Sequence, residues 1–372
     1  MCILGIPTLN LLAITESIIL KIYIRISLIY LLEKMLRYNK QIMNSKKRKY
    51  DESSDDEFNI NEYNISDLDS LINMIEDFMI KPCSKKTKRQ LPKKFNKLTN
   101  ILDELYELNN LIGLKVLKQQ LIDQILFFIK EVDESIMMHT VIYGPPGTGK
   151  TSVARIMAKI YAGLGILKKN KFREVKREDL IGQYLGETTI KTMETLEECK
   201  NGVMFIDEAY SLGDDSKGDS YSKEAIDAIN QYLTEHSHDL ICIIAGYKNE
   251  LEYCFFAKNP GLKRRFPWTF SINEFGVEEL MNVLKIKIDS SEWDYEDSYD
   301  KVRSLITQNK QYLTGNGGDI ENILAKAKII NIRKNFLNND KTLTQDDIIE
   351  SINQFLLTRK ETTNEPPYGM YT

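Results

Sequence analysis

The chain has 372 residues, which is long enough for a large hydrophobic core and for more than one folding unit. Its formal net charge of −4 excludes a global basic field, so nucleic acid is not indicated as a partner. The five cysteines are scattered and form no C-x-x-C pair, which argues against a disulfide framework and against a zinc site. We therefore expect an intracellular, cytoplasmic protein.

An apolar segment opens the chain. Three charged side chains interrupt residues 3–32, so no clean run of about 18 apolar residues exists for a spanning helix. No basic segment precedes the apolar residues, which argues against a signal peptide. We expect residues 1–43 to be an N-terminal extension of uncertain status, either dispensable or in contact with a membrane surface through residues 3–32. Because Met43 opens a hydrophilic sequence, a start there stays an alternative.

Residues 44–95 join a basic block to an acidic, serine-rich block. Low hydrophobicity of this kind predicts a disordered basic/acidic linker. The basic cluster Lys46–Lys49 is also typical of a nuclear import signal, which leaves a nuclear location open. Within the linker, apolar residues indicate a short helix near Leu68–Ile80, and a second basic run, Lys85–Arg89, follows it.

Residues 96–272 alternate between two kinds of apolar pattern. Helical periodicity runs through Ile101–Leu108 and Val116–Ile129. The runs Val203–Ile206 and Leu240–Ala245 are wholly apolar, as expected of strands that are buried in a parallel sheet. This alternation predicts an α/β fold with helices on the faces of a parallel sheet.

A glycine-rich motif follows a short apolar strand at His139–Tyr143. It fits G-x-x-x-x-G-K-[ST] with Gly144, Pro145, Pro146, Gly147, Thr148, Gly149, Lys150 and Thr151, and Ser152 continues into a helix. The glycines let backbone N–H groups face phosphates, and the helix that begins at Lys150 points its positive end at the same anion. Lys150 reaches the outer phosphates, and the Thr151 hydroxyl can bind Mg²⁺. The motif therefore predicts a site for ATP and Mg²⁺.

Two acidic residues come directly after the strand expected at Val203–Ile206. Asp207 is placed to hold Mg²⁺ through water, and Glu208 to orient and deprotonate the attacking water. Ligands of such sheets bind at the carboxyl ends of the strands. We therefore expect these two acids to lie beside the glycine-rich loop, together with the turn at Gly246-Tyr247.

Together these motifs resemble the CbbX/SpoVK-like branch of AAA+ ATPases, which includes the red-type Rubisco activase. The resemblance covers roughly Leu105–Leu357, and Gly144–Thr151 corresponds to the family's P-loop. It also rests on Leu111–Leu114, Asp179–Thr188, Phe205–Leu212, Ala245–Tyr247 and Asn259–Pro267. The resemblance implies a P-loop NTPase parallel sheet flanked by helices, the AAA+ core, followed by a C-terminal all-helical lid over residues 273–358. It further implies ATPase activity and a homo-oligomeric ring, with a hexamer as the family expectation.

The resemblance assigns roles to residues outside the P-loop. Ile112 and Gly113 match the segment that lies beside the adenine. Arg265, just before a phenylalanine, matches the arginine finger that reaches the neighbouring subunit's ATP. The adjacent Arg264 is the alternative.

Tyr184 and Leu185 match the aromatic and aliphatic pair that grips a polypeptide in the central pore. Without the resemblance, Tyr184 would equally be an ordinary half-buried tyrosine. The function expected is a chaperone-like remodeller of an unknown protein client. A nucleic-acid-handling AAA+ ATPase and a nucleotide-gated scaffold with little turnover are the alternatives.

The chain departs from the family in the lid. Helices are expected there near Val277–Ile288, Val302–Tyr312, Asp319–Phe336 and Thr344–Leu357, with a disordered tail over residues 359–372. Gly318 and Glu321 stand where the family usually has arginines, one of which, sensor 2, contacts the nucleotide from the lid. The polar sensor position of the fourth strand falls near Tyr247. These departures put the coupling of the lid to the ATP state in question.

Overall fold

The structure of this protein is a computed structural model that describes residues 57–130, 136–184, 186–213, 220–295, 298–337 and 341–364. The expectations for the apolar extension and for Lys46–Lys49 lie outside these residues. No helix in the described ranges is long and apolar enough to cross a membrane. The chain divides into two compact units: the described part of the first comprises residues 57–64 and 72–91, and the second comprises residues 65–71 and the chain from Pro92.

The described part of the first unit is folded, so the expectation of disorder over residues 44–95 is wrong for residues 57–64 and 72–91. A 3₁₀ turn at Ile60–Glu62 precedes α2 (Leu68–Ile80), which lies where the sequence predicted a helix, and α3 (Lys85–Gln90) follows. Phe58 is fully buried, and its ring lies 5.2 Å from that of Phe78. Buried apolar side chains at helical spacing in α2 supply the hydrophobic stabilisation that the average composition of the segment concealed.

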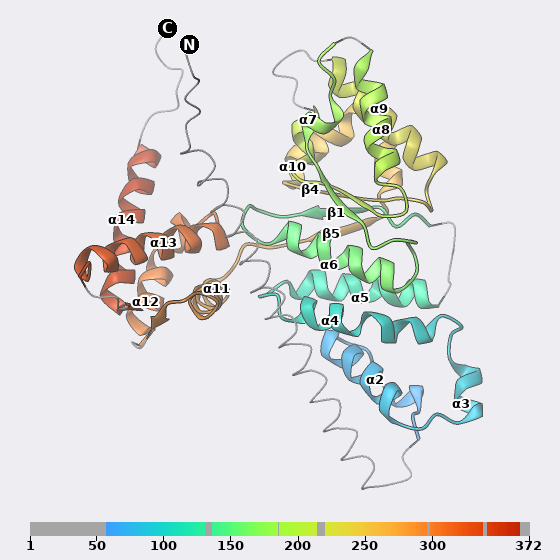
Figure 1. The fold of residues 1–372 in the computed structure, drawn as a ribbon, viewed down its shortest axis with the longest axis horizontal. Coiled ribbons are helices and arrows are strands. Elements are labelled where there is room, and N and C mark those ends of the chain that lie inside the picture. Colours follow the sequence, from blue (N-terminus) through green and yellow to red (C-terminus); the bar gives the residue numbers. More distant parts are fainter. Residues whose placement is uncertain are drawn as a thin grey trace, which may run out of the picture. The chain divides into compact units, whose positions relative to one another are not determined.

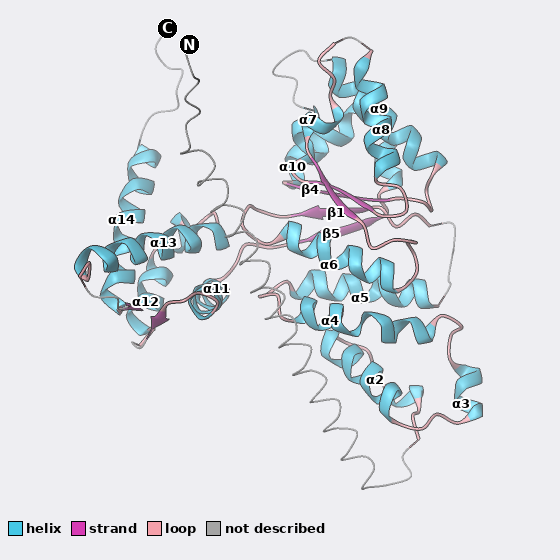
Figure 2. Ribbon diagram, in the orientation of Figure 1, coloured by secondary structure: helices cyan, strands magenta, loops and turns pink. Residues whose placement is uncertain are grey.

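A parallel five-stranded sheet forms the centre of the second unit (Figures 1 and 2), which confirms the predicted α/β class. Its strands, in the order β2-β3-β4-β1-β5, are β1 (Thr140–Tyr143), β2 (Phe172–Val175), β3 (Val203–Ile206), β4 (Ile241–Gly246) and β5 (Trp268–Ser271). The three inner strands are buried along their whole length, while β2 and β5 form the edges and expose part of their side chains. Strand β4 lies between β1 and β3, so the carboxyl ends of these three strands are neighbours.

Helices cover both faces of this sheet (Figure 1). On one face lie α4 (Leu102–Asn109), α5 (Lys115–Ile129) and α6 (Lys150–Gly163), after a 3₁₀ helix at Phe95–Ile101. On the other lie α7 (Arg177–Leu180), α8 (Glu187–Glu198), α9 (Ser220–Glu235) and the short α10 (Lys248–Glu250). A π-helical turn at Leu251–Phe255 and a 3₁₀ turn at Leu262–Arg265 lead from α10 to β5.

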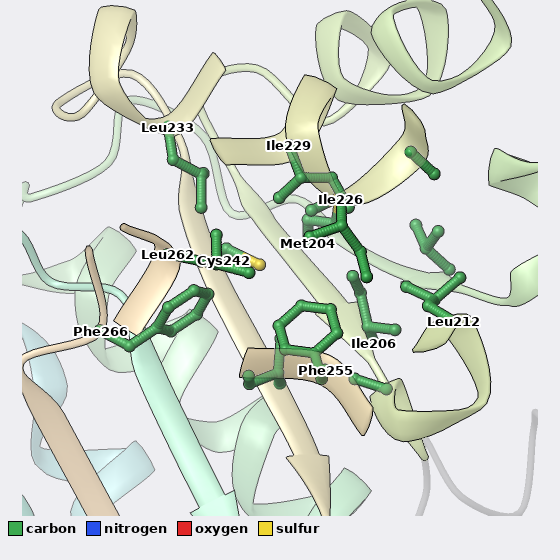
Figure 3. Packing of buried hydrophobic residues seen from close by; sticks show 14 of the residues in the cluster. Met204, Ile206, Leu212, Ile226, Ile229, Leu233, Cys242, Phe255, Leu262 and Phe266 are labelled. Atoms are coloured by element: carbon green, nitrogen blue, oxygen red, sulfur yellow. The ribbon is translucent and has the colours of Figure 1, made fainter. Parts of the chain in front are cut away.

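The core between the sheet and α9 is continuous (Figure 3). Helix α9 contributes Ile226, Ile229 and Leu233 to this core, where they pack with Met204 and Ile206 of β3 and with Cys242 of β4. The surrounding turns add Leu212, Phe255, Leu262 and Phe266. Burial of these side chains fixes β3 and therefore the position at which its acidic end leaves the sheet.

Four helices form the lid, α11 (Val277–Asp289), α12 (Asp300–Gln308), α13 (Gly317–Lys334) and α14 (Gln345–Asn364), and they share one apolar core. Two details correct the expectations. A pair of short parallel strands, β6 (Asp294–Tyr295) and β7 (Thr342–Leu343), makes the lid not purely helical. Helix α14 also continues through the first residues of the expected disordered tail, because Arg359 donates to the buried Asp319 carboxylate at 3.0 Å.

Candidate functional site

A cavity of about 600 Å³ lies at the carboxyl ends of the inner strands. The P-loop after β1, Asp207 and Glu208 after β3, and Gly246-Tyr247 after β4 line it on the core side. Helices α11 and α13 line it on the lid side. The sheet order thus brings together the three segments that the sequence predicted to meet. The volume is within the range of cavities that enclose a small organic ligand.

The P-loop turns sharply into α6. Gly147 and Gly149 have φ values of 69° and 86°, which side chains with a Cβ rarely adopt. The ammonium of Lys150 donates to the carbonyl oxygens of Gly144 and Pro145, at 3.1 and 2.9 Å. Burial lowers the pKa of Lys150, and the carboxylates of Asp207 and Glu208, which follow β3, oppose that shift. Lys150 is thereby held beside the loop as a partly desolvated cation that is available to bind an incoming phosphate.

Asp207 joins the P-loop to the end of β3. Its Oδ2 accepts a hydrogen bond from the Thr151 hydroxyl at 3.2 Å, and its Oδ1 accepts one from the Glu208 N–H at 3.0 Å. Glu208 is exposed and has a φ of 49°, which is uncommon for a residue other than glycine. Strain of this kind is concentrated at functional sites. Here it places the Glu208 carboxylate on the cavity next to Asp207.

The oxygen donors of Thr151 and Asp207 fit a magnesium ion. Mg²⁺ prefers oxygen ligands and is commonly bound by one or two protein groups together with substrate phosphates. Among the described residues no group of three or more His, Cys, Asp or Glu could hold a metal by itself. The two donors therefore suit a metal that arrives with a nucleotide.

Two tyrosines form the wall beside Glu208. The rings of Tyr210 and Tyr247 lie 6.2 Å apart, and both residues line the cavity. Burial, with the nearby Glu208 carboxylate, raises the pKa of Tyr210 to about 12. Gly246 leaves room for this wall, because a Cβ there would lie 3.0 Å from the Tyr210 ring. Tyr247 is thus a polar group at the place where the sequence expected the fourth-strand sensor.

The lid side of the cavity carries residues that sequence reasoning did not single out. Phe275, Val283 and Ile286 form an apolar surface there. Lys287 of α11 also lines the cavity, and it forms an ion pair with Glu321 of α13. The cation on this side therefore comes from α11, a position that no motif in the sequence marks.

The predicted adenine segment is divided between the cavity and its surroundings. Ile112 lines the cavity, as do its neighbours Leu111 and Leu114. Gly113 is not in the lining. Its φ of 66° turns the segment, and a Cβ there would lie 3.2 Å from the Glu279 side chain.

Neither candidate finger arginine lines the cavity of its own chain. The guanidinium of Arg265 donates to the Thr234 hydroxyl at 2.9 Å and to the Gly261 carbonyl at 3.1 Å. Arg264 is exposed and has no hydrogen-bond or ion-pair partner among the described residues.

The predicted pore residue Tyr184 is also outside the cavity. Its side chain is 69 % exposed, so the alternative of a half-buried tyrosine is wrong. The Glu187 carboxylate accepts from the N–H groups of Gln183 and Tyr184, both at 3.2 Å, and fixes the backbone of the loop. Leu185 lies outside the described residues.

Comparison with known proteins agrees with these features. The profile of the "ATPase family associated with various cellular activities (AAA)" matches residues 140–253. The "Putative cfxQ-like protein R730" of Acanthamoeba polyphaga mimivirus is 35 % identical over 82 % of this chain and 76 % of that protein. The chloroplastic "Ribulose bisphosphate carboxylase/oxygenase activase" of Cyanidioschyzon merolae is 32 % identical over 69 % of this chain and 90 % of that protein. "Stage V sporulation protein K" of Bacillus subtilis is 35 % identical over 51 % of this chain and 60 % of that protein.

Proposed function

Because the chain belongs to the CbbX/SpoVK-like branch of the AAA+ ATPases, we propose that it hydrolyses ATP in a ring of identical subunits and thereby remodels a protein client. The observation that carries the hydrolysis is the pair of Thr151 and Asp207, whose oxygens lie 3.2 Å apart with Glu208 next to them. Binding alone requires the P-loop, whereas a water-orienting carboxylate at this place serves turnover.

Each residue of the site has a proposed role. Lys150 leaves its two carbonyl partners and offsets the charge of the outer phosphates. Thr151 and Asp207 hold Mg²⁺, which when bound neutralises charge on the β- and γ-phosphates. Glu208 accepts a proton from the attacking water while the oxygen of that water bonds to the γ-phosphorus. The bond between the γ-phosphorus and the leaving ADP oxygen breaks in the same step.

The ring is proposed from the arginines. A guanidinium that lies outside the cavity of its own chain can contribute to a neighbour's site, and head-to-tail contacts of that kind form a ring when the rotation between subunits closes. The family expectation of a hexamer supplies the number of subunits. Arg265 remains the proposed finger, although its partners Thr234 and Gly261 must release it, and Arg264 is the alternative.

The client is proposed to be a polypeptide. The name of the Cyanidioschyzon merolae relative states that it activates an enzyme, which is a protein client. In this chain the exposed ring of Tyr184 offers the apolar surface that such an activity needs. The identity of that relative's client does not carry over to this chain.

The test is the Glu208→Gln variant. It should bind ATP as the wild type does but hydrolyse it about two to four decades more slowly, the usual worth of a positioned base. The same variant should retain its client and so allow the client to be identified from a pull-down in ATP. Turnover within twofold of the wild type would remove Glu208 from the mechanism.

One observation favours the nucleotide-gated scaffold as a second candidate. Among the described residues that line the cavity, the lid contributes the Lys287–Glu321 ion pair and no arginine. The two opposite charges of the pair partly cancel, which weakens the electrostatic attraction for the nucleotide. A wild-type protein that binds ATP but shows no turnover above that of Glu208→Gln would select the scaffold.

A further inference from the structure

The lid touches the P-loop through a turn of three residues, Gly315, Asn316 and Gly317, which we call the lid turn. The Gly317 N–H donates to the Gly147 carbonyl oxygen at 3.0 Å. The Asn316 side-chain amide donates to the Pro146 carbonyl oxygen at 3.1 Å. Both acceptors belong to the P-loop, so two hydrogen bonds join the lid to the backbone that would surround the phosphates.

Asn316 is fully buried and uses both ends of its amide. Its Oδ1 accepts from the Phe275 N–H at 2.8 Å, which fixes the orientation of the group because a backbone amide can only donate. The Nδ2 therefore faces Pro146 and Thr314, whose carbonyl oxygens lie at 3.1 and 3.0 Å. The residue holds this position with φ 51° and ψ −122°, a conformation that glycine adopts more readily. The hydrogen bonds of the Asn316 side chain thus stabilise a backbone conformation that is unfavourable for a residue other than glycine.

Glycines make the contact close. A Cβ on Gly147 would lie 2.1 Å from the Gly315 carbonyl oxygen, and one on Gly317 would lie 2.8 Å from the Gly147 carbonyl oxygen. Backbone therefore meets backbone without an intervening side chain, and a small movement of either segment changes the hydrogen bonds directly.

The lid turn is in turn braced from within the lid. Asp319, buried in the first turn of α13, accepts from the Gly315 N–H at 2.7 Å. Its other oxygen accepts from Arg359 of α14 at 3.0 Å. This chain of contacts ties the lid turn to two lid helices, so they should move with it.

We propose that Asn316 and Gly317 couple the lid to the nucleotide through the P-loop backbone, in place of the arginines that are absent at Gly318 and Glu321. The inference rests on the proposed function, because it assumes that the P-loop binds ATP. Phosphates engage the N–H groups of such a loop, and the lid turn engages its carbonyl groups. A phosphate that reorients the P-loop would therefore also move the Pro146 and Gly147 carbonyl oxygens, which accept the hydrogen bonds of the lid turn. Asn316 is a positioning residue here and touches no reacting atom.

Two variants remove the coupling in different ways. Asn316→Gly keeps a residue that tolerates the observed backbone conformation but removes the side-chain bonds to both segments. Asn316→Asp keeps an acceptor for the Phe275 N–H and loses the donor to Pro146. The matched control is Asn331→Ala. Asn331 is another buried lid asparagine, and its amide donates to Thr342 and Asp347 instead of the P-loop.

The experiment measures ATP affinity by calorimetry, and hydrogen exchange of residues 313–320 with and without ATP. In the wild type, ATP should slow exchange of the Gly317 amide. In both Asn316 variants ATP should bind about tenfold more weakly, from the loss of a buried hydrogen bond, and exchange in the lid turn should no longer respond to it. Asn331→Ala should lower the melting temperature yet keep the exchange response.

The outcomes separate the coupling from the proposed function. If the wild type bound no ATP, both would be overturned. If the wild type bound ATP, and ATP still slowed hydrogen exchange in the lid turn of both Asn316 variants, the coupling alone would be overturned. The coupling would also be overturned if Asn331→Ala abolished the response, because general loosening of the lid would then explain the effect.

Discussion

The hydroxyl of Thr151 donates to the Asp207 carboxylate across 3.2 Å, and this bond links the first turn of α6 to the end of β3. The same two side chains are proposed to hold Mg²⁺, Thr151 through its hydroxyl and Asp207 through water. Thr151→Val keeps the shape of the side chain and removes the hydroxyl. We expect ATP hydrolysis to fall by about two to three decades, since a catalytic metal contributes several kcal/mol.

The control for this variant is Thr151→Ser, which keeps the hydroxyl and should stay within about tenfold of the wild type. Both should be assayed over a range of Mg²⁺ concentrations. A Thr151→Val enzyme with normal turnover and normal dependence on Mg²⁺ would show that this hydroxyl is not a metal ligand.

The two arginines can be distinguished by mixing subunits. Arg265→Ala should bind ATP but block turnover, because the finger acts on the neighbour's γ-phosphate. Mixing it with Lys150→Ala should restore partial ATPase, since each chain supplies the group that the other lacks. The parallel mixture of Arg264→Ala with Lys150→Ala serves as the comparison.

Thermal melting adds an independent measure. Arg265→Ala loses the bonds to Thr234 and Gly261 and should be destabilised by about 1 kcal/mol, whereas the exposed Arg264 should matter little. Restoration of ATPase only in the Arg264→Ala mixture would identify Arg264 as the finger. Absence of restoration in both mixtures would argue against a site shared between subunits.

Gly318→Arg would return a cation to the place where the family has one. A Cβ at Gly318 meets no atom within 4 Å, and the residue lines the cavity, so the structure has room for a longer side chain. Replacing glycine in a helix also improves helix propensity by up to about 1 kcal/mol. We expect tighter ATP binding by about tenfold, from one hydrogen bond to a charged group, without loss of stability.

Gly318→Gln is the matched variant, because it has a similar reach and no charge. Calorimetry should show the gain for arginine alone, and the gain should shrink at high ionic strength. Equal affinities of the two variants and the wild type would show that this side of the cavity does not reach the phosphates.

The inner part of the fold could be predicted because short, continuous stretches of sequence determine its strands and turns. Strands β3 and β4 are uninterrupted apolar runs, and the glycines of the P-loop mark the turn before α6. The edge strands differ from them. Strand β2 exposes Glu174 and β5 exposes Thr269 and Ser271, so neither sequence contains an uninterrupted apolar run that would predict its bounds. The centre of the sheet could therefore be predicted because its strands are buried along their whole length.

Long-range contacts account for what was missed. Nothing near Lys287 in the sequence indicates that it meets Glu321 across the lid, and the end of α14 depends on a bond from Arg359 to a carboxylate 40 residues away. Nothing in the sequence around Asn316 indicates its contact with the P-loop. The expected linker was wrong for a different reason, because the low average hydrophobicity of residues 44–95 was given more weight than the apolar residues near Leu68–Ile80, which form the buried face of α2.

The last prediction concerns the proposed grip on the client. Tyr184 is 69 % exposed, and Glu187 holds the backbone on which it stands, so its ring projects from a fixed loop. An aromatic face can hold any polypeptide by contact area and stacking, without reading its sequence. Tyr184→Ala should therefore abolish client remodelling while it preserves ATP binding, ring assembly and basal ATPase. Because no buried contact is lost, the free energy of unfolding should change by no more than about 0.5 kcal/mol.

Two further variants make the test of Tyr184 specific. Tyr184→Phe keeps the ring and should retain remodelling, since the grip depends on the aromatic surface rather than on the hydroxyl. Tyr253→Ala removes a tyrosine that is 78 % exposed on the turn after α10, and it should leave remodelling intact. Remodelling by a well-folded Tyr184→Ala ring at the wild-type rate would contradict the grip and favour the nucleotide-gated scaffold. A large fall in melting temperature, with activity lost in proportion, would instead assign Tyr184 a structural role that its exposure gives no reason to expect.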